Sequence, residues 1–247
     1  GDGHTLAGAW SDRFADGKLG VLIGLTTSER TFGSDNTETG GAWDGDLLEE
    51  FQRRDYTITR ERDGGVFNLE YRPGGRETYY LRSLVSRFSD DEERQRHDIE
   101  FDNPQAPGQL GDASAARELK SRKETQNIYS LVLGTTQELG AWDLDVQAGF
   151  GQAEERTPRH VASAAFESGL TYQAGYDSRG EPEWIGDAAI NDAAAYELDS
   201  IEVEKQLTED KEHNLRLDLG RRFSAWGGEH ELKFGGKASW REKTNEI

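Results

Sequence analysis

The side chains that could carry catalysis are present in the sequence but scattered. Cysteine is absent from the 247 residues, which excludes disulfides and thiolate metal sites. No Gly-x-Ser-x-Gly elbow accompanies the serines, and Gly33 lacks the strand–turn–helix context of a phosphate cradle. The histidines show no metal-ligand spacing, and they are His4, His97, His160, His213 and His230. The sequence therefore predicts no catalytic site, no cofactor and no enzyme activity.

Clusters of carboxylates offer the oxygen ligands that a hard cation such as calcium prefers. They are the acidic run 90–93 and the pair Asp44 and Asp46. Neither cluster has the spacing of an EF-hand loop, and a solvated charged surface explains both more simply, so we expect no metal site. The formal net charge of -19 also argues against a nucleic-acid partner, because a face that binds DNA or RNA should be basic.

Aromatic residues in long polar connections are candidates for ligand binding. Trp43, Tyr172, Tyr176 and Trp184 lie in such connections, where they could stack on a sugar or a siderophore. The simpler alternative is that they pack the connection 157–198 into a compact unit. We keep the four as candidate contacts to a small-molecule ligand that the sequence does not identify.

The segments between these connections alternate apolar and polar residues with a period of two, which indicates β-strands. The alternation is clearest from Trp142 to Phe150. If the leucines of 215–219 and the apolar residues of 232–236 face lipid, the charged residues between them must point into a barrel lumen, because a charge on the lipid face costs about 2–4 kcal/mol near mid-bilayer. This set of lumen-facing residues comprises Arg216, Asp218, Lys233 and Lys237.

Short and long connections alternate along the chain. The short turns lie near 15–18, 73–76, 139–141 and 224–228, and the long, extracellular loops near 33–46, 103–111 and 157–198. Short periplasmic turns and long extracellular loops are typical of outer-membrane barrels. The prediction is an all-β, antiparallel up-and-down meander of about eight long strands, a partial transmembrane β-barrel. The expected strands are 4–14, 18–33, 46–72, 77–102, 112–138, 142–156, 199–222 and 229–245.

Two further patterns refine this expectation. The segment Asp63-Gly64-Gly65 could be a bulge or a hairpin turn, and we favour a bulge because a turn would break the alternation of short and long connections. Aromatic residues lie beside the short turns, as in the girdles that barrels carry at the membrane interface. They are Phe14, Tyr71, Tyr79, Tyr80, Trp142, Phe223 and Trp226.

Several segments resemble the barrel of TonB-dependent outer-membrane receptors. The longest are 54–62 (RDYTITRER), 68–73 (NLEYRP) and 81–92 (LRSLVSRFSDDE). Shorter ones are 16–21 (DGKLGV), 154–158 (EERTP) and 232–237 (LKFGGK). The similarity spans most of the chain, but it is a likeness of strand texture and scattered motifs, none of which is a catalytic signature.

The resemblance implies a location in the outer membrane, with lipid around a 22-stranded barrel and a plug domain inside it. It also implies energised uptake of a bulky nutrient, such as a siderophore, a chelate or an oligosaccharide, with TonB as partner. The chain departs from this pattern, because it shows no plug or TonB box and stops at Ile247 without a terminal aromatic. We therefore expect residues 1–247 to be a single internal segment of such a barrel.

Two other interpretations stay open. The chain could be a small self-contained outer-membrane barrel or passive channel, in which eight strands close around a filled interior. It could also be a soluble all-β binding module whose apolar face packs against a second layer. The second is weakened by the lack of a further set of elements to cover the apolar faces.

Overall fold

The chain folds into one open antiparallel sheet. The computed structural model describes residues 1–39 and 41–246, so that Ile247 lies outside the described residues. Strands make up 83% of the structure, and eleven of them belong to one sheet. The order β1-β2-β4-β5-β6-β7-β10-β11 follows the chain without a crossover, which confirms the expected all-β up-and-down meander. Within the described residues the sheet is not closed, and β1 and β11 form its two edges.

The eight strands of this path are long, and three short strands accompany them. The long strands are β1 (Asp2–Phe14), β2 (Leu19–Glu38), β4 (Leu47–Tyr71), β5 (Glu77–Gln105), β6 (Gly111–Leu139), β7 (Trp142–Ser168), β10 (Tyr196–Ala225) and β11 (Gly228–Glu246). The short ones are β3 (Trp43–Asp44), β8 (Tyr172–Asp177) and β9 (Glu183–Gly186). Two short 3-10 helices, η1 (Ala188–Asn191) and η2 (Ala193–Ala195), precede β10.

The short turns have backbone conformations that suit tight hairpins. Trp226 and Gly227 both have positive φ, at 48° and 81°, and they connect β10 to β11 across the pair Ala225 and Gly228. Two consecutive residues of this kind match the right-handed twist of the flanking strands. Gly140 has φ 71° in the corresponding turn between β6 and β7.

The strands continue well into the segments that we expected to be long loops. Strand β2 runs on to Glu38 and β5 to Gln105, while β7 continues to Ser168 and β10 already begins at Tyr196. The extension 33–38 is polar on both faces, and the extension 157–168 contains apolar residues such as Val161 and Phe166 without regular alternation, so neither shows the pattern that marks a strand in the sequence. Backbone pairing with the neighbouring strand holds them instead.

The expected bulge at Asp63-Gly64-Gly65 is not formed. These residues pair in continuous register with Thr27, Thr26 and Leu25, and β4 passes through them without a shift. On the other side they pair equally regularly with 85–87 of β5. A hairpin turn is excluded for the same reason. The two glycines are ordinary strand residues, and side chains of neighbouring strands approach both of them closely, Thr26 at Gly64 and Val85 at Gly65.

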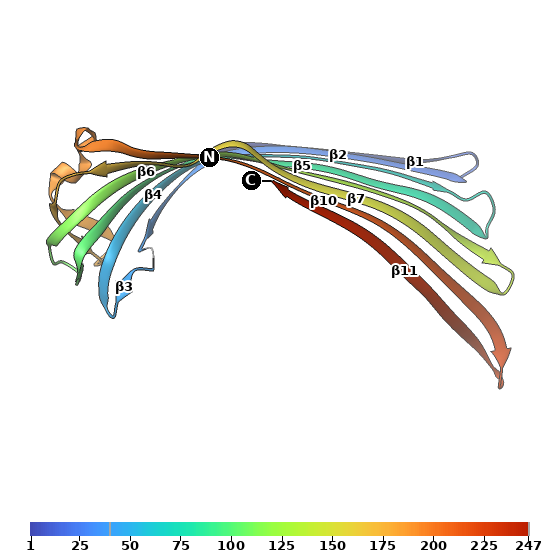
Figure 1. The fold of residues 1–247 in the computed structure, drawn as a ribbon. Coiled ribbons are helices and arrows are strands. Elements are labelled where there is room, and N and C mark those ends of the chain that lie inside the picture. Colours follow the sequence, from blue (N-terminus) through green and yellow to red (C-terminus); the bar gives the residue numbers. More distant parts are fainter. Residues whose placement is uncertain (40, 247) are drawn as a thin grey trace.

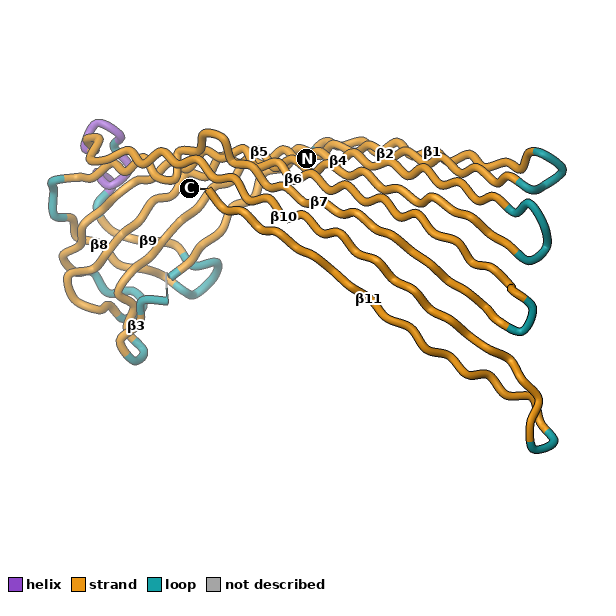
Figure 2. The backbone as a smooth tube through the Cα atoms, turned by 45° about the vertical axis from the view of Figure 1, so that its right-hand side comes forward, coloured by secondary structure: helices purple, strands orange, loops and turns teal. Residues whose placement is uncertain are grey.

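The sheet bends into an arch with two unlike halves (Figures 1 and 2). The short-turn half, on the right of Figure 1, ends in the four tight turns. We define it as residues 2–30, 63–88, 127–153 and 211–241. The capped half, on the left, comprises 31–62, 89–126 and 154–210, and it contains β3, β8, β9 and the 3-10 helices. The buried hydrophobic core lies entirely in the capped half.

Candidate functional site

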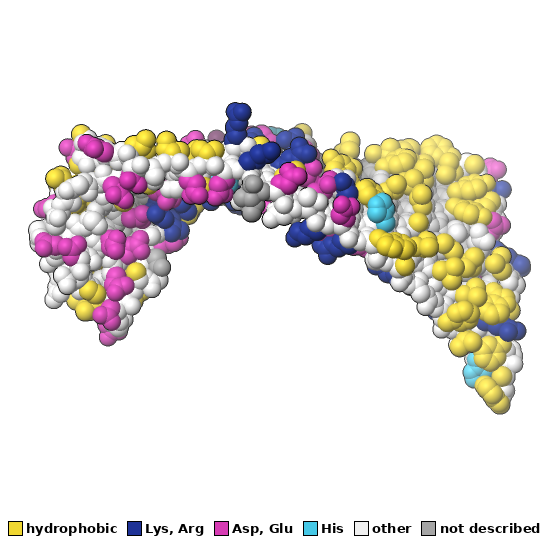
Figure 3. Space-filling model, in the orientation of Figure 1, with side chains coloured by type: hydrophobic (Ala, Val, Ile, Leu, Met, Phe, Trp, Pro, Cys, Tyr) yellow, Lys and Arg dark blue, Asp and Glu magenta, His cyan; other side chains and the backbone are white. Residues whose placement is uncertain are grey.

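One face of the short-turn half carries a continuous apolar band. The strand registers place apolar side chains of all eight long strands on the same face, in rows such as Ile23, Phe67 and, two strands further, Leu131. The band comprises Trp10, Phe14, Leu19, Val21, Ile23, Leu25, Phe67, Leu69, Leu81, Val85, Tyr129, Leu131, Leu133, Leu144, Val146, Phe150, Leu215, Leu217, Leu219, Leu232 and Phe234. Figure 3 shows hydrophobic side chains gathered over this half.

Nothing in the described part of the chain covers the apolar band. Leu25 is 66% exposed, Leu217 48% and Phe234 52%, although all three are large and apolar. Soluble monomers rarely expose contiguous apolar patches larger than a few hundred Å², and patches beyond that mark surfaces that meet a partner or a membrane. The band is therefore a surface that needs an apolar environment.

Aromatic side chains line the end of the band beside the short turns. Trp142 meets Phe234 with ring centroids 6.5 Å apart, and Tyr71 meets Tyr79 at the same distance. Trp226, in the β10–β11 turn, is 91% exposed. Tyr80 departs from the expected girdle. Its side chain lies on the opposite face of β5, where the Arg82 guanidinium stacks over its ring at 4.5 Å.

The face opposite the apolar band is polar and rich in glycine. The four candidate lumen residues all lie on it, between the leucines and phenylalanine of the band. Arg216 pairs in register with Lys237, while Asp218 and Lys233 each oppose a glycine. Arg216 Nε lies 2.6 Å from Asp218 Oδ2, so this ion pair joins two residues of one strand and does not bridge neighbouring strands. Orientation toward a lumen stays a prediction, because the described sheet is open.

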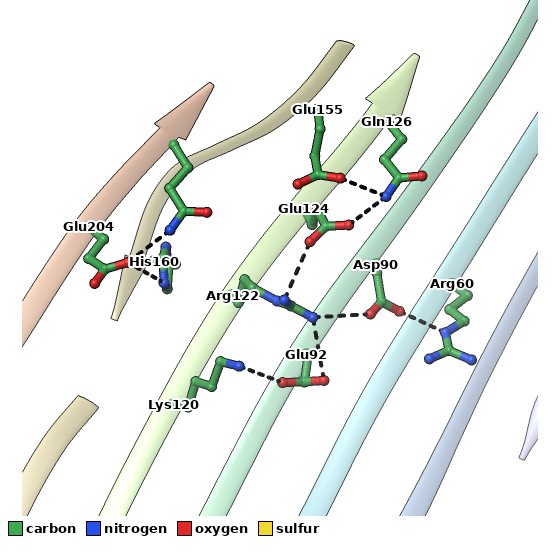
Figure 4. Close-up of polar contacts among 11 residues, drawn as sticks. Arg60, Asp90, Glu92, Lys120, Arg122, Glu124, Gln126, Glu155, His160 and Glu204 are labelled. Atoms are coloured by element: carbon green, nitrogen blue, oxygen red, sulfur yellow. Dashed lines mark hydrogen bonds and ion pairs between the residues drawn. The ribbon is translucent and has the colours of Figure 1, made fainter. Parts of the chain in front are cut away.

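In the capped half the same polar face carries an ion-pair ladder across β4, β5 and β6 (Figure 4). Asp90, only 8% exposed, accepts from Arg60 Nε at 2.8 Å and lies 3.8 Å from Arg122 Nη2. Arg122 also approaches Glu92 at 3.8 Å and Glu124 at 3.4 Å. The ladder consists of Arg60, Asp90, Glu92, Lys120, Arg122 and Glu124. Asp90 and Glu92 make the ladder a cross-strand brace, because each contacts a cation from an adjacent strand, whereas Glu124 pairs with Arg122 of its own strand.

Most carboxylates of the acidic run 90–93, which the sequence offered as cation ligands, form ion pairs with basic side chains. Asp90 and Glu92 are engaged by arginine and lysine, and Asp91, on the other face, pairs with Lys123 at 3.4 Å. Among residues 1–39 and 41–246, no group of three or more His, Asp or Glu side chains is placed to hold a metal ion.

The aromatic candidates gather at the capped end, where two of them serve as core. Tyr172 is 2% exposed and Tyr176 4%, and both pack in a buried cluster with Phe51 and Ile99. Trp184 packs against the edge of this cluster. Trp43 is 46% exposed and meets Tyr176 edge-on at 6.4 Å. Ligand contact thus stays a prediction for Trp43 and Trp184, while the tyrosines fold the connection into a compact unit.

A polar groove of about 560 Å³ opens beside Trp184. Its lining combines this indole with the guanidinium of Arg53 and with acidic and amide side chains from the end of β2 and from the segment 181–191, which are far apart in the sequence. These are Asp35, Asn36, Glu181, Glu183 and Asn191. An aromatic surface beside several hydrogen-bonding groups suits a small polar ligand with an apolar face, because few polar groups then fix its orientation.

A half-buried polar cluster that the sequence did not suggest connects the cap to the sheet. The hydroxyl of Tyr196 donates to the carbonyl of Ile190 at 2.7 Å, so its oxygen accepts from Nε2 of His97 at 2.9 Å. Arg117 Nη2 donates to the carbonyl of Asn191 at 3.0 Å, and its guanidinium stacks over the Tyr196 ring. The cluster therefore joins β5, β6 and β10 to η1.

Burial shifts the pKa of two adjacent residues in opposite directions. Burial lowers the pKa of His97 to about 4, and the positive charges of Arg117 and Arg53 add to the effect. Burial raises the pKa of Asp98 to about 6 against the opposing effect of Arg96, with Glu50 and Glu118 adding to the rise. Because successive strand residues point to opposite faces, these groups titrate on opposite sides of the sheet.

Comparisons with known proteins do not assign the chain to a family. No family model matches the chain, no curated protein is significantly similar to it, and no solved structure matches it. Within the described residues, no helix is long and apolar enough to cross a membrane.

Proposed function

We propose that the chain forms part of the wall of a transmembrane β-barrel in a Gram-negative outer membrane. The observation that carries the proposal is the uncovered apolar band, backed by a polar, glycine-rich face. The segment from Trp142 to Phe150 has the length of about 9–11 residues that a tilted strand needs to cross a bilayer. Lipid would cover the band, and the polar face would line the lumen.

The role that fits this wall best is uptake of a bulky nutrient by a TonB-dependent receptor. Three features support it: the resemblance of the strands to that family, the tall polar walls of the capped half, and the groove beside Trp184. In such a receptor, further strands would pair with β1 and β11, whose outer edges are open in the described sheet. The plug and TonB would then be partners of the complete barrel, and the cargo would be a siderophore, chelate or oligosaccharide.

The two alternative functions, a self-contained barrel or passive channel and a soluble binding module, each require a contact at the strand edges or over the apolar band. A self-contained barrel or passive channel would need β1 to pair with β11, which the described sheet does not show. A soluble binding module would need a second layer over the apolar band. The band's exposure therefore favours a membrane wall over the soluble module.

The membrane wall can be tested with single cysteines, because the chain has none of its own. Each residue of 214–219 is replaced in turn by cysteine, labelled with a polarity-sensitive fluorophore, and reconstituted in vesicles that contain nitroxide-labelled lipid. We expect quenching at Leu215, Leu217 and Leu219 but not at the residues between them. Labels at Leu198 and Val203, exposed apolar positions of the capped half, serve as controls that lipid should not quench. A chain that stays in the buffer with every label unquenched contradicts the proposal.

The uptake role needs a separate measurement in cells that make the complete protein. Replacing Trp184 by alanine should slow growth only when one nutrient, such as iron, cobalamin or a particular oligosaccharide, is scarce. Dissipating the proton gradient should abolish the same uptake. Uptake that persists without the gradient would instead indicate a passive channel.

A further inference from the structure

The apolar band has a hollow at its border with the capped half. One row of the band runs from Gly8 through Leu25, Gly65 and Val85 to Tyr129, so that two of its five positions carry no side chain. The hollow is an open groove of about 720 Å³, and its walls are mostly apolar. The next row toward the short turns carries large side chains again, Trp10, Ile23 and Phe67.

The two glycines on the floor of the groove, Gly8 and Gly65, have different surroundings. A Cβ added at Gly8 would meet no atom within 4 Å, so this position opens directly onto free space. A Cβ at Gly65 would lie 3.1 Å from Val85 and 3.4 Å from Leu25, whose side chains form the walls there. The open part of the groove therefore lies over Gly8, while the side chains of Val85 and Leu25 already fill the space at Gly65.

The rim of the groove toward the capped half is polar and carries an uncommitted cation. Asp63, Arg87 and Asn127 lie in the row above the glycines. Asp63 accepts a hydrogen bond from the Thr27 hydroxyl at 2.8 Å. Arg87 is exposed and takes part in no ion pair within residues 1–39 and 41–246. Its guanidinium thus remains available at the level where apolar side chains give way to charged ones.

We propose that this groove binds one acyl chain of a phosphate-bearing membrane lipid whose headgroup contacts Arg87. An acyl chain matches the apolar groove, and a phosphate matches the fork of guanidinium donors. The height is also consistent, because the phosphates of a lipid lie where the hydrocarbon region ends. The inference rests on the proposed membrane location and adds to it a specific lipid site in the leaflet nearest the capped half.

Charge complementarity favours this occupant over another protein segment. The chain carries a net charge of -19, so a second copy would bring mainly carboxylates to the groove. One basic side chain over an apolar groove instead fits a ligand with one anionic head and one hydrocarbon tail. A lipid needs no further strand or partner to reach this surface.

The site can be tested by native mass spectrometry of the chain in detergent micelles, titrated separately with phosphatidylglycerol and phosphatidylcholine. We expect one tightly bound phosphatidylglycerol with a preference over phosphatidylcholine. Arg87→Gln should weaken phosphatidylglycerol binding about fivefold and remove the preference, since one basic residue near a lipid surface contributes about this much. Arg87→Lys should retain most of the preference, because it keeps the charge.

Two matched substitutions examine the groove itself. Gly8→Leu should fill the groove and weaken the binding of both lipids. Gly236→Leu is its control, because Gly236 also belongs to the apolar face, also has nothing within 4 Å of its Cβ position, and lies on β11 far from the groove. Arg156→Gln controls for loss of a cation, since Arg156 is already paired with Glu154.

Three results would overturn the lipid site. They are equal affinity for the two lipids, an unchanged preference in Arg87→Gln, and equal effects of Gly8→Leu and Gly236→Leu. Failure of the membrane location is recognised separately, because it would abolish the alternating quenching at 214–219, whereas failure of the lipid site would leave that pattern intact.

Discussion

The two halves of this sheet share the same strands and the same ladder of backbone pairs, yet they use apolar side chains in opposite ways. In the capped half, Phe51 and Ile99 are 2% and 1% exposed beneath the returning connection. In the short-turn half, Phe67, on the same strand and the same face as Phe51, is 40% exposed. One continuous sheet thus has a buried core in its capped half and an uncovered apolar band in its short-turn half.

The polar faces of the two halves differ as well. The ladder of the capped half joins neighbouring strands through Asp90, Arg122 and their partners, whereas Arg216 and Asp218 in the short-turn half pair within one strand. In the capped half, cross-strand ion pairs and a packed cap connect neighbouring strands. The difference teaches that the backbone ladder alone does not determine how each half is stabilised.

The largest expected effect comes from the core of the capped half. Phe51→Ala should destabilise this half by about 3–5 kcal/mol, because it leaves a cavity in a packed cluster. Phe67→Ala is the matched control in the band and should cost less than about 1 kcal/mol in lipid, since lipid tails replace the lost contacts. Hydrogen exchange of strand β5 in bilayers measures both. Equal losses of protection would show that the two halves do not differ in this way.

An arginine introduced at an exposed leucine should destabilise the short-turn half more than the capped half. Leu217 and Leu198 lie on the same strand with 48% and 52% of their surface exposed, one in each half. Leu217→Arg should lower the stability of the inserted chain by about 2–4 kcal/mol, whereas Leu198→Arg should change it by less than about 0.5 kcal/mol. Urea titration of vesicle-reconstituted chains measures the difference. In a soluble module the two substitutions would have similar small effects.

The ion-pair ladder should contribute more than the paired charges of the short-turn half. Asp90→Asn leaves Arg60 and Arg122 without their shared, largely buried carboxylate, and we expect a loss of about 1–3 kcal/mol. Asp218→Asn removes a pair within one strand and should cost less than about 1 kcal/mol. Thermal unfolding, monitored by hydrogen exchange of β6 and β10, measures the stability losses of both variants. A larger loss of stability in Asp218→Asn than in Asp90→Asn would show that the ladder does not stabilise the capped half by joining its strands.

Much of the fold follows from local patterns in the sequence. The alternation from Trp142 to Phe150 and the glycines of the short turns predict the strands and hairpins of the short-turn half, because a strand with one apolar and one polar face shows a period of two. The continuation of β2 to Glu38 and of β7 to Ser168 could not be predicted in this way, because neither segment shows a regular alternation of apolar and polar residues. Their order depends on pairing with strands distant in the sequence.

The capped end shows a second reason why sequence analysis fell short. Tyr172 and Trp184 appear alike in the sequence, yet one is core and the other borders a groove, a difference set by where β8 and β9 fold back. The ladder did leave a signal, because the charges at 90, 92, 94 and 96 share one face by their spacing of two. The His97 cluster left none, since its partners come from β6, η1 and β10.

The smallest effect, and the most specific to the capped half, is its pH dependence. His97, with a pKa of about 4 in the folded chain and 6.5 as its ordinary value, contributes stability above pH 6.5 that is lost as the pH falls to about 4. Asp98, raised from 3.8 to about 6, contributes stability below about pH 4 that is lost as the pH rises through 6. Between pH 6 and 4 the two effects therefore oppose each other, and the chain should respond weakly to acid.

Replacing either His97 or Asp98 should reveal the effect of the other group on the pH dependence of stability. His97→Gln should make the capped half more stable at pH 4.5 than at pH 6.5, and Asp98→Asn should make it less stable at pH 4.5. Exchange rates at each pH, corrected for the intrinsic pH dependence of amide exchange, measure this for β5 and β6, while the β10–β11 hairpin of the short-turn half serves as an internal reference. Variants that both keep the pH profile of the parent chain would show that neither group is coupled to folding of the cap. A pH response confined to the capped half would instead show that the two halves unfold as separate cooperative units, although they share every long strand except β1 and β11.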